Sequence, residues 1–498
     1  MIKRMNTVLI KRLLFWSIFI ILVVWTGVLC FYHLGEAGIQ NWDEARHIVN
    51  AYEMMSSDNL WINTYFYETD YYNFKPPLSM WLIMLSFRIF GINSYSMRLF
   101  SAVSMFLLFI VLVLFTASVF GKRAATITGV VFISVTDVFF FHMARSADAD
   151  AIYILLFTIS ILCLYKSEKK PFYIIGFGLF LSLAFMAKSF HAAIGFVIFI
   201  CYLPRIYKNL NLKHYISMII AGSIPVGIWA VIRYSYDGLA FFRGMFLGEV
   251  VDRVENSRYY FMYLINFGKK PIIMLSVIAV IIGILVIILN KGTGEKVTIN
   301  RFVKNIIYND LYLIVLWLFI PLAAYSASGA FMEWYCYICY FPFYIIVGAV
   351  LGQVSVLGGK TRIVAAILLI LPLIGCVLGT KQSIWKLNTL SYENNIDIRK
   401  DIASLIESYP EYSGKYCYIE NSRNEYQPQN VWEQNNVAEA YIQGDLIPVN
   451  GGVQLFLEDK EAILIISKNI FENYYDLLAG RIILVDGSDY LIFNNYFY

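Results

Sequence analysis

Residues 13–32 read LLFWSIFIILVVWTGVLCFY, twenty consecutive residues without a charged side chain. A helix of about 20 apolar residues is long enough to cross the hydrocarbon core of a bilayer. Similar runs recur along the chain, in which hydrophobic residues make up 59% and charged residues only 15%. This composition, with a mean hydropathy of +0.62, excludes an ordinary soluble protein. The sequence therefore predicts an all-α polytopic membrane protein.

The order of basic clusters predicts how the chain crosses the membrane. Basic residues precede the first span, and no small-residue cleavage pattern follows it, which favours an uncleaved helix over a signal peptide. Cytoplasmic loops are enriched in Lys and Arg, and strict alternation from a cytoplasmic N-terminus places all six basic clusters inside. We therefore expect a multi-pass protein of the cytoplasmic (plasma) membrane. The expected spans are 13–32, 98–120, 124–142, 149–165, 171–188, 191–204, 215–234, 270–289, 311–329, 338–357 and 363–380.

One apolar segment, residues 76–90, is predicted not to cross the membrane. It begins with Pro76-Pro77, contains Arg88 and has only 15 residues. Fifteen helical residues cover about 22 Å, which is less than the roughly 30 Å hydrocarbon core. We expect this helix to lie in the outer interface or to re-enter the membrane.

The last 117 residues differ in composition from the rest of the chain. Residues 382–498 carry 8 basic and 17 acidic side chains, whereas residues 1–381 carry 31 and 18. Apolar runs at 462–466 and 482–485 flank the helix-like segment 470–479, which indicates a small soluble α/β domain. We expect a transmembrane domain at 1–381, with a first external loop at 33–97 that carries juxtamembrane helices, and an extracytoplasmic domain at 382–498. No sequence feature indicates a nucleic-acid partner.

Charged residues of the first external loop are candidates for chemistry. The motif Asn41-Trp42-Asp43-Glu44-Ala45-Arg46 lies about ten residues beyond the first span, where a lipid-borne substrate can reach it. Acidic residues that begin an interfacial helix, where they meet the helix dipole, are the alternative. Lys75 stands directly before two prolines, so its ammonium group can be held against a lipid phosphate. A lysine that reaches toward lipid headgroups is the alternative.

A second group of charges crowds the turn before residue 150. Arg145, Asp148 and Asp150 lie between two apolar segments, where charged side chains are costly. The group is a candidate site, and a local ion pair of Arg145 with Asp148 or Asp150 is the alternative. Lys188 interrupts a further apolar stretch, and its expected partner is Asp150 or a phosphate.

Later loops contribute two more candidate regions. Arg253 and Arg258 precede the aromatic run 259–261, and Trp334-Tyr335 open a late aromatic cluster. Charge and aromatic faces together suit sugar binding. An amphipathic surface helix and an aromatic belt at the membrane interface are the alternatives.

In combination these motifs resemble a known family. The matching residues are Trp42-Asp43-Glu44-Ala45-Arg46, Lys75-Pro76-Pro77-Leu78, Trp81-Leu82, Phe90-Gly91, Arg98-Leu99 and Ala144-Arg145-Ser146-Ala147-Asp148-Ala149-Asp150. Their order and spacing are similar to those of the GT-C membrane glycosyltransferases of the protein-mannosyltransferase and lipid A aminoarabinose-transferase (ArnT-like) kind. The similarity extends over residues 1–205 and more loosely to 380. It implies the GT-C fold, with about 11 to 13 transmembrane helices and a soluble C-terminal domain.

The resemblance also implies roles for individual residues. Asp43 would be the catalytic carboxylate, Asp150 the second acidic residue of the site and Lys75 a ligand of the polyprenyl phosphate. Glu44 is expected near the substrate or as a structural partner of Arg46 or Arg98. The other expected substrate-binding residues are Arg145, Asp148, Lys188, Arg253, Arg258, Trp334 and Tyr335.

The sequence departs from the family at two places. The family's lysine at the position of Lys188 is usually followed by glycine and proline, whereas Ser189 and Phe190 follow here. Some members use a glutamate before the first lysine and a histidine in the later outer loop as metal ligands, but this chain has Phe74 and no histidine between 235 and 269. We assign no metal ligands, although a divalent cation remains compatible with the site.

The expected activity is transfer of a hexosyl or pentosyl group from a polyprenyl-phosphate donor at the outer face of the membrane. The acceptor would be a hydroxyl or phosphate of a glycolipid, protein or cell-wall polymer. Asp43 would take the acceptor proton in an inverting displacement, while Lys75, with Arg253 or Arg258, would stabilise the phosphate. The alternative is a transporter or flippase of lipid-linked sugars. Transporters usually place ionisable residues near the middle of the membrane in two related halves, whereas the charges here cluster outside.

Overall fold

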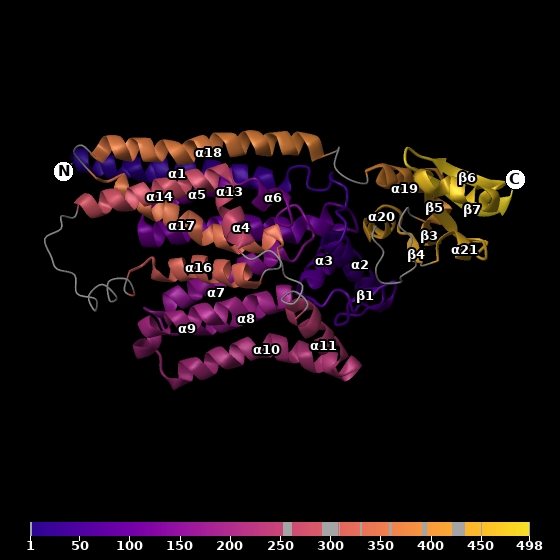
Figure 1. Cartoon of the computed structure of the whole chain (residues 1–498), viewed down its shortest axis with the longest axis horizontal. Coiled ribbons are helices and arrows are strands. Elements are labelled where there is room, and N and C mark those ends of the chain that lie inside the picture. Colours follow the sequence, from indigo (N-terminus) through magenta and orange to yellow (C-terminus); the bar gives the residue numbers. More distant parts are fainter. Residues whose placement is uncertain are drawn as a thin grey trace. The chain divides into compact units, whose positions relative to one another are not determined.

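The computed structural model describes residues 2–251, 261–290, 307, 309–328, 331–357, 361–390, 396–420, 434–449 and 451–497 (Figure 1). Contacts divide the chain into two compact units, each assembled from separate parts of the sequence. The first, which we call the membrane unit, comprises Met1–Tyr32, Ala102–Ala144 and Asp150–Lys386. The second, which we call the mixed unit, comprises His33–Ser101, Arg145–Ala149 and Leu387–Tyr498. The predicted domain boundary after residue 381 stays a prediction.

The membrane unit is built from helices. Its α-helices are α1 (Ile2–Phe31), α4 (Leu99–Phe120), α5 (Lys122–Ser134), α6 (Asp137–Phe140), α7 (Asp150–Ser167), α8 (Tyr173–Lys188), α9 (Ile194–Ile206), α10 (Leu212–Asp237), α11 (Ala240–Phe246), α13 (Met262–Lys269), α14 (Pro271–Asn290), α16 (Tyr312–Ser328), α17 (Tyr337–Val354) and α18 (Thr361–Thr389). Short 3₁₀ helices include η2 (Ser189–Ala193) and η5 (Glu333–Cys336). Within the described residues, seven helical segments are long and apolar enough to cross a membrane. The predicted polytopic membrane architecture is therefore confirmed.

Helix α17 is the most enclosed helix among the seven candidate spans. Of its 18 residues, all but Gln353 are buried, and it packs against α5, α14 and α16. A Cβ atom on Gly348 would lie 2.1 Å from Oγ1 of Thr128 and 2.5 Å from the carbonyl oxygen of Ala124. Small residues one turn apart let membrane helices approach closely. Gly348 and Gly352 therefore set the contact between α17 and α5.

One predicted span is shorter than its apolar pattern indicates. The helix expected over 124–142 ends at Ser134, because Val135 is extended (φ −98°, ψ 95°). The hydroxyl of Thr136 donates to the carbonyl oxygen of Gly379 at 3.2 Å and shares a hydrogen bond with Ser383. These contacts provide hydrogen-bond partners for the hydroxyl of Thr136 just beyond the end of α5. The chain then forms the short α6, which begins with Asp137.

The mixed unit combines the first loop with the C-terminal residues. The first loop forms α2 (Asp43–Ser56), the hairpin β1 (Thr64–Tyr65) and β2 (Glu68–Thr69), α3 (Leu78–Phe90) and η1 (Ser96–Arg98). The later elements are α19 (Ile396–Ser408), η7 (Pro410–Tyr412), β3 (Tyr416–Glu420), α20 (Gln434–Gly444), β4 (Ile447–Val449), α21 (Gly452–Phe456), β5 (Ile463–Ser467), α22 (Lys468–Phe471), η8 (Glu472–Tyr474), α23 (Tyr475–Leu478), β6 (Arg481–Asp486) and β7 (Tyr490–Phe497).

A five-stranded sheet confirms the predicted α/β character of the C-terminal residues. Its strand order is β4-β3-β5-β7-β6. Strand β3 runs parallel to β4 and β5, and β7 runs antiparallel to β5 and β6. The helix expected over 470–479 is instead divided into α22, η8 and α23, because Tyr474 leaves the helical region. Its hydroxyl donates to Glu420 on β3 at 3.3 Å.

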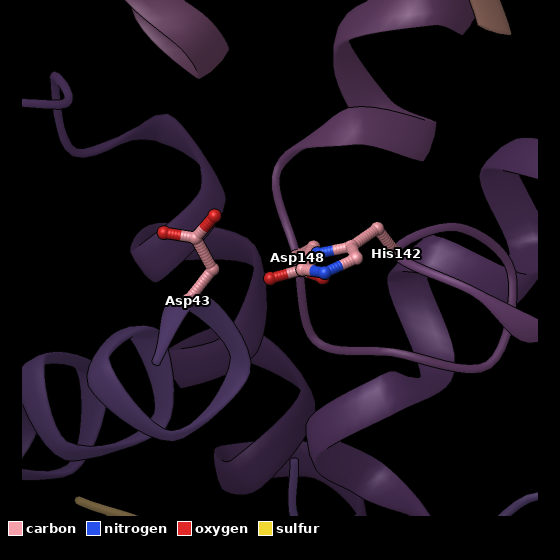
Figure 2. Close-up of side chains that lie close together, drawn as sticks. All are labelled: Asp43, His142 and Asp148. Atoms are coloured by element: carbon pink, nitrogen blue, oxygen red, sulfur yellow. The ribbon is translucent and has the colours of Figure 1, made fainter. Parts of the chain in front are cut away.

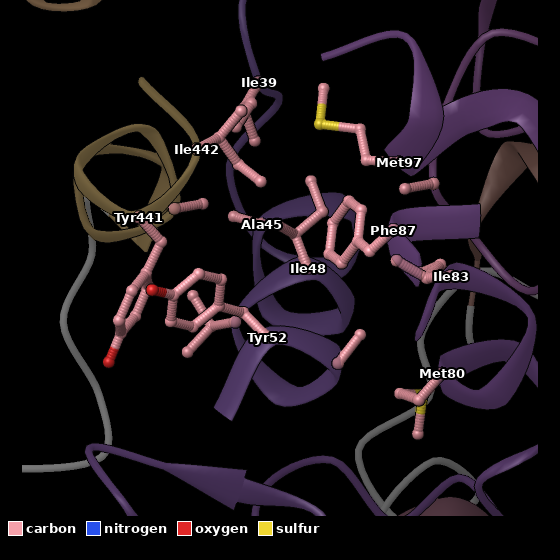
Figure 3. Packing of buried hydrophobic residues seen from close by; sticks show 14 of the residues in the cluster. Ile39, Ala45, Ile48, Tyr52, Met80, Ile83, Phe87, Met97, Tyr441 and Ile442 are labelled. Carbon is pink, nitrogen blue, oxygen red and sulfur yellow. The ribbon is translucent and has the colours of Figure 1, made fainter. Parts of the chain in front are cut away.

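Helices α2, α3 and α20 enclose one hydrophobic core (Figure 3). The ring of Tyr52 on α2 lies 4.2 Å from the ring of Tyr441 on α20, measured between centroids. Ile48 and Phe87 are almost completely buried in the same cluster. Each such side chain contributes roughly 1.5–3 kcal/mol when removed from water. The first loop and the C-terminal residues therefore fold around a shared core.

An ion pair within the same unit fixes the start of α2. Glu44 and Arg98 are each 1% exposed, and Nε of Arg98 donates to Oε1 of Glu44 at 2.7 Å. The guanidinium group also donates to the carbonyl oxygens of Ala37 and Gly38. The sequence predicted Glu44 either as a substrate-binding residue or as a structural partner of Arg46 or Arg98. In the structure it pairs with Arg98.

We expect Arg98→Met to destabilise the protein strongly. The substitution leaves the Glu44 carboxylate buried without its cation, and breaking a buried pair typically costs about 3–5 kcal/mol of unfolding free energy. The measurement is the thermal unfolding midpoint of the full chain in detergent. Arg88→Met on the exposed side of α3 is the matched control and should change the midpoint little. Equal midpoints for the two variants would contradict the structural role of the pair.

Candidate functional site

Asp43 and Lys75 meet, although 32 residues separate them in the sequence. Asp43 is the first residue of α2 and follows Trp42, whose positive φ of 70° turns the chain into the helix. Nζ of Lys75 donates to Oδ1 of Asp43 at 3.1 Å. Asp43 is 37% exposed and Lys75 15% exposed. The two groups are therefore paired and remain accessible to a ligand.

The loop that carries Lys75 is held by buried polar contacts. Asp70 accepts two hydrogen bonds from Arg46, at 2.7 and 2.6 Å, and others from the backbone amides of Tyr72 and Asn73. Burial alone would raise the pKa of Asp70, but its hydrogen bonds with Arg46 and the charge of Arg46 lower it below the ordinary value. Asp70 is therefore a fixed anion. Nδ2 of Asn63 also donates to the carbonyl oxygen of Lys75 at 2.9 Å.

The turn at residues 145–149 adds further predicted residues to the mixed unit. Nη2 of Arg145 donates to the carbonyl oxygen of His33 at 2.6 Å. The hydroxyl of Ser146 donates to Asp148 at 2.8 Å, and the amide of Ala147 donates to Glu44 at 2.9 Å. The turn is thus attached to α2 through the same carboxylate that pairs with Arg98.

Asp43 and Asp148 bring two carboxylates together. Their nearest oxygens lie within 4.8 Å of each other. Figure 2 shows Asp43 at the start of α2 and Asp148 on the turn, and also labels His142 of the membrane unit. Two carboxylates could contribute to a divalent-cation site, but calcium and magnesium bind six or more ligands. Within the described part of the mixed unit, these residues alone do not define a metal centre.

His47 is a buried neighbour of the site that the sequence motifs do not single out. It lies one turn after Asp43 on α2 and is 1% exposed. Its Nδ1 lies 3.2 Å from the carbonyl oxygen of Ala147 and 3.8 Å from Oδ1 of Asp148. Burial, with the charge of Lys75, lowers the pKa of His47 to about 4. The imidazole is therefore neutral at neutral pH. His47 could have been identified in the sequence by its i, i+4 spacing from Asp43.

The buried His47 predicts a pH dependence of stability. Because its folded-state pKa lies below the value of about 6.5 for an unfolded chain, stability is lost as the pH falls from about 6.5 to 4. The loss reaches about 3 kcal/mol by this linkage. His47→Gln removes the titration, so the midpoint of the wild-type protein should fall relative to that of the variant over this interval. Thermal unfolding in detergent between pH 4 and 7.5 measures the difference. Parallel curves for the two proteins would contradict the prediction.

In the membrane unit, Lys188 pairs with Asp150. Lys188 ends α8, Asp150 begins α7, and each is 5% exposed. Nζ of Lys188 donates to Oδ1 of Asp150 and lies 4.7 Å from the ring centroid of Tyr335. Nδ1 of His191 lies 2.8 Å from the hydroxyl of Tyr325 beside this group. The structure therefore brings three predicted residues together, namely Asp150, Lys188 and Tyr335.

Trp334 is part of an adjacent cluster in the same unit. Its indole ring stacks on His142 with centroids 3.8 Å apart. The preceding Glu333 lies 2.9 Å from Nζ of Lys270, which also pairs with Asp137. Asp137 and Lys270 belong to none of the sequence motifs described above. The signal that could have identified them is a charged residue within or beside an apolar segment.

Two predicted substrate-binding residues, Arg253 and Arg258, lie outside the described residues. Their roles stay predictions.

Part of the chain is similar in sequence to known proteins. Residues 74–232 match the family model described as dolichyl-phosphate-mannose-protein mannosyltransferase. An uncharacterised protein of Aquifex aeolicus (strain VF5) is 25% identical over 266 residues. The alignment covers 51% of this chain and 52% of that protein. The chain thus spans about half the length of this curated relative.

Solved structures extend the comparison to nearly the whole chain. ArnT from Cupriavidus metallidurans bound to undecaprenyl phosphate matches with a TM-score of 0.68 and 13% identity, over 96% of this chain and 98% of that one. The apo oligosaccharyltransferase of Archaeoglobus fulgidus matches with a TM-score of 0.52 and 11% identity, over 93% and 70% of the two chains. The chain therefore has the GT-C fold. With the family-model match, these structures confirm the predicted resemblance to the GT-C membrane glycosyltransferases of the protein-mannosyltransferase and ArnT-like kind.

Proposed function

We propose that the protein transfers a sugar from a polyprenyl-phosphate donor to an acceptor hydroxyl or phosphate at the outer face of the cytoplasmic membrane. The observation that carries this proposal is the accessible pair of Asp43 and Lys75, joined at 3.1 Å and held on a frame of buried ion pairs. One group can accept a proton, and the other can stabilise a phosphate. The match to the mannosyltransferase model and the similarity to an ArnT bound to undecaprenyl phosphate support this class of donor.

The proposed reaction is a single displacement at the anomeric carbon. Asp43 takes the proton of the acceptor, whose oxygen forms the new bond as the bond to the donor phosphate breaks. Lys75 stabilises the departing phosphate, and the configuration at the anomeric carbon inverts. Because Asp43 is paired with Lys75 before substrate binds, an incoming phosphate would draw Lys75 away and let Asp43 act as the base.

Other predicted residues enter the proposal with different functions. Glu44 is 1% exposed, and its carboxylate bonds to Arg98 and to the backbone amides of Gln40 and Ala147. Its proposed function is therefore to hold the backbone of the site in place and not to bind the substrate. Arg145 and Asp148 would shape the acceptor side from the mixed unit. Asp150, Lys188, Trp334 and Tyr335 lie in the membrane unit, and their substrate-binding roles stay predictions.

The proposed orientation follows from the basic clusters of the sequence. The N-terminus would be cytoplasmic, and the mixed unit would face away from the cytoplasm. Lipid-linked donors would then reach Asp43 and Lys75 from the outer leaflet.

Asp43→Asn should nearly abolish transfer. Loss of a general base typically lowers the rate by about 10²–10⁴-fold. The assay uses purified protein with a radiolabelled polyprenyl-phosphate sugar and membrane extract as acceptor, and it measures release of free polyprenyl phosphate. Asp58→Asn, at an exposed position in the same unit, is the matched control. Normal turnover by Asp43→Asn would refute its role, and movement of the lipid without cleavage by the wild-type protein would favour the transporter alternative.

Lys75→Ala should weaken use of the lipid donor. Since Lys75 is proposed to bind the donor phosphate, its loss should raise the apparent KM for the donor. It should also lower kcat, because the departing phosphate is stabilised less. Lys400→Ala, which removes an exposed lysine of the same unit, serves as the control. A donor dependence identical to that of the wild type would remove Lys75 from the proposed site.

A further inference from the structure

The hairpin of the first loop contains an unusual turn. Thr64 pairs with Thr69, and Tyr65 pairs with Glu68, so that only Phe66 and Tyr67 connect the strands. Both have positive φ, 54° and 59°. A two-residue turn with two positive φ values is a type I′ turn, which favours Asn and Gly. An aromatic residue there costs roughly 1–2 kcal/mol, so the surrounding structure must hold this turn in place.

The carboxylate that holds the turn is Glu53. Its two oxygens accept the backbone amides of Phe66 at 2.9 Å and Tyr67 at 2.8 Å. The hydroxyl of Tyr441 on α20 donates to the same carboxylate at 2.8 Å. Glu53 is fully buried, and burial raises its pKa to about 7 while these hydrogen bonds oppose the shift. The strained turn is thus fastened to both α2 and α20.

The turn forms one wall of a pocket of about 370 Å³. The opposite wall comes from the start of β3 and from β4. The lining residues are Phe66, Tyr67, Glu68, Tyr416, Ile447, Pro448 and Val449. This volume lies at the lower end of the roughly 300–1,000 Å³ typical of small-molecule sites.

The chemistry of the lining distinguishes between classes of ligand. Tyr67 and Tyr416 are 44% and 53% exposed, and Glu68 is exposed beside them. Aromatic faces pack against the C–H faces of a sugar ring, while a carboxylate and phenol hydroxyls bond to its hydroxyl groups. The described lining contains no Lys or Arg, which disfavours a phosphate or another anion.

Strand addition by a peptide is also disfavoured at this edge. Strand β4 is an edge strand that pairs with β3, and the amide of Ile447 donates to the carbonyl oxygen of Lys415 on the β3 side. Because successive residues of a strand point their backbone groups to opposite sides, Pro448 faces the open edge. Proline has no amide hydrogen to donate. A peptide strand would therefore lack a donor at the centre of β4.

We propose that this pocket is a saccharide-binding site of the mixed unit. Tyr67 and Tyr416 provide its stacking faces, and Glu68 accepts hydrogen bonds from sugar hydroxyls. The site goes beyond the proposed transfer chemistry, because binding needs neither the lipid donor nor Asp43. If the proposed function holds, the bound saccharide would belong to the acceptor.

The test measures binding of trisaccharides of mannose, of glucose and of N-acetylglucosamine to the full chain. The protein is placed in lipid nanodiscs, because maltoside detergents are themselves saccharides, and binding is followed by saturation-transfer NMR and calorimetry. We expect saturable binding of at least one trisaccharide. Tyr67→Asn, which removes the ring but suits the left-handed turn, and Tyr416→Ala should each weaken it tenfold or more.

Three control variants show whether binding depends on this pocket. Tyr67→Phe keeps the ring and should retain most of the affinity, and Tyr475→Ala, which removes an exposed tyrosine elsewhere in the mixed unit, should leave binding unchanged. Asp43→Asn should bind the trisaccharide as the wild type does, so failure of transfer and failure of this site are distinguishable. The proposal is overturned if the wild type binds none of the three trisaccharides, or if Tyr67→Asn and Tyr416→Ala leave binding unchanged.

Discussion

The buried carboxylate of Glu44 is the contact on which the mixed unit most depends. It pairs with Arg98, 54 residues away, and accepts the backbone amides of Gln40 and Ala147. One side chain thereby joins the entry to α2, the 3₁₀ helix η1 and the turn before α7. The cost of removing both charges from water is offset only while every partner stays in place. Since Asp43 precedes Glu44 and Asp148 follows Ala147, this contact also fixes the backbone that carries two candidate site residues.

Neighbouring acids on α2 have opposite environments because successive residues of a helix point in different directions. Glu44 is 1% exposed, whereas Asp43 is 37% exposed and contacts Lys75. The site thus combines an immobile interior charge with an accessible one. The same principle recurs where Glu53 holds the turn at Phe66 and Tyr67, and where Glu439 accepts the amide of Ile39 at 3.0 Å. Buried carboxylates replace regular secondary structure as the partners of loop amides, which leaves the loops free to present aromatic and charged side chains.

Much of the fold and part of the candidate site could be predicted from the sequence. Apolar length is a local property, so ten of the eleven expected spans coincide with a helix over most of their length, and the strands β5 and β6 follow from their apolar runs. The motif residues Asp43 and Lys75 were predicted for one site, and the expected partner of Lys188 was Asp150 or a phosphate. The early end of α5 was not predictable, because it is accompanied by hydrogen bonds that link Thr136 to the distant residues Gly379 and Ser383.

The sequence by itself determined that this chain is a polytopic membrane protein with a small α/β region and a charged first loop, since hydropathy and residue order are written along the chain. Only the tertiary structure decided which apolar helix is enclosed, because the burial of α17 depends on contacts with other helices, such as the close approach of Gly348 to Thr128. It also decided that the first loop shares a core with α20, and that Glu44 rather than Asp43 is buried. These outcomes depend on contacts between residues 54 to 400 positions apart, which no local pattern encodes.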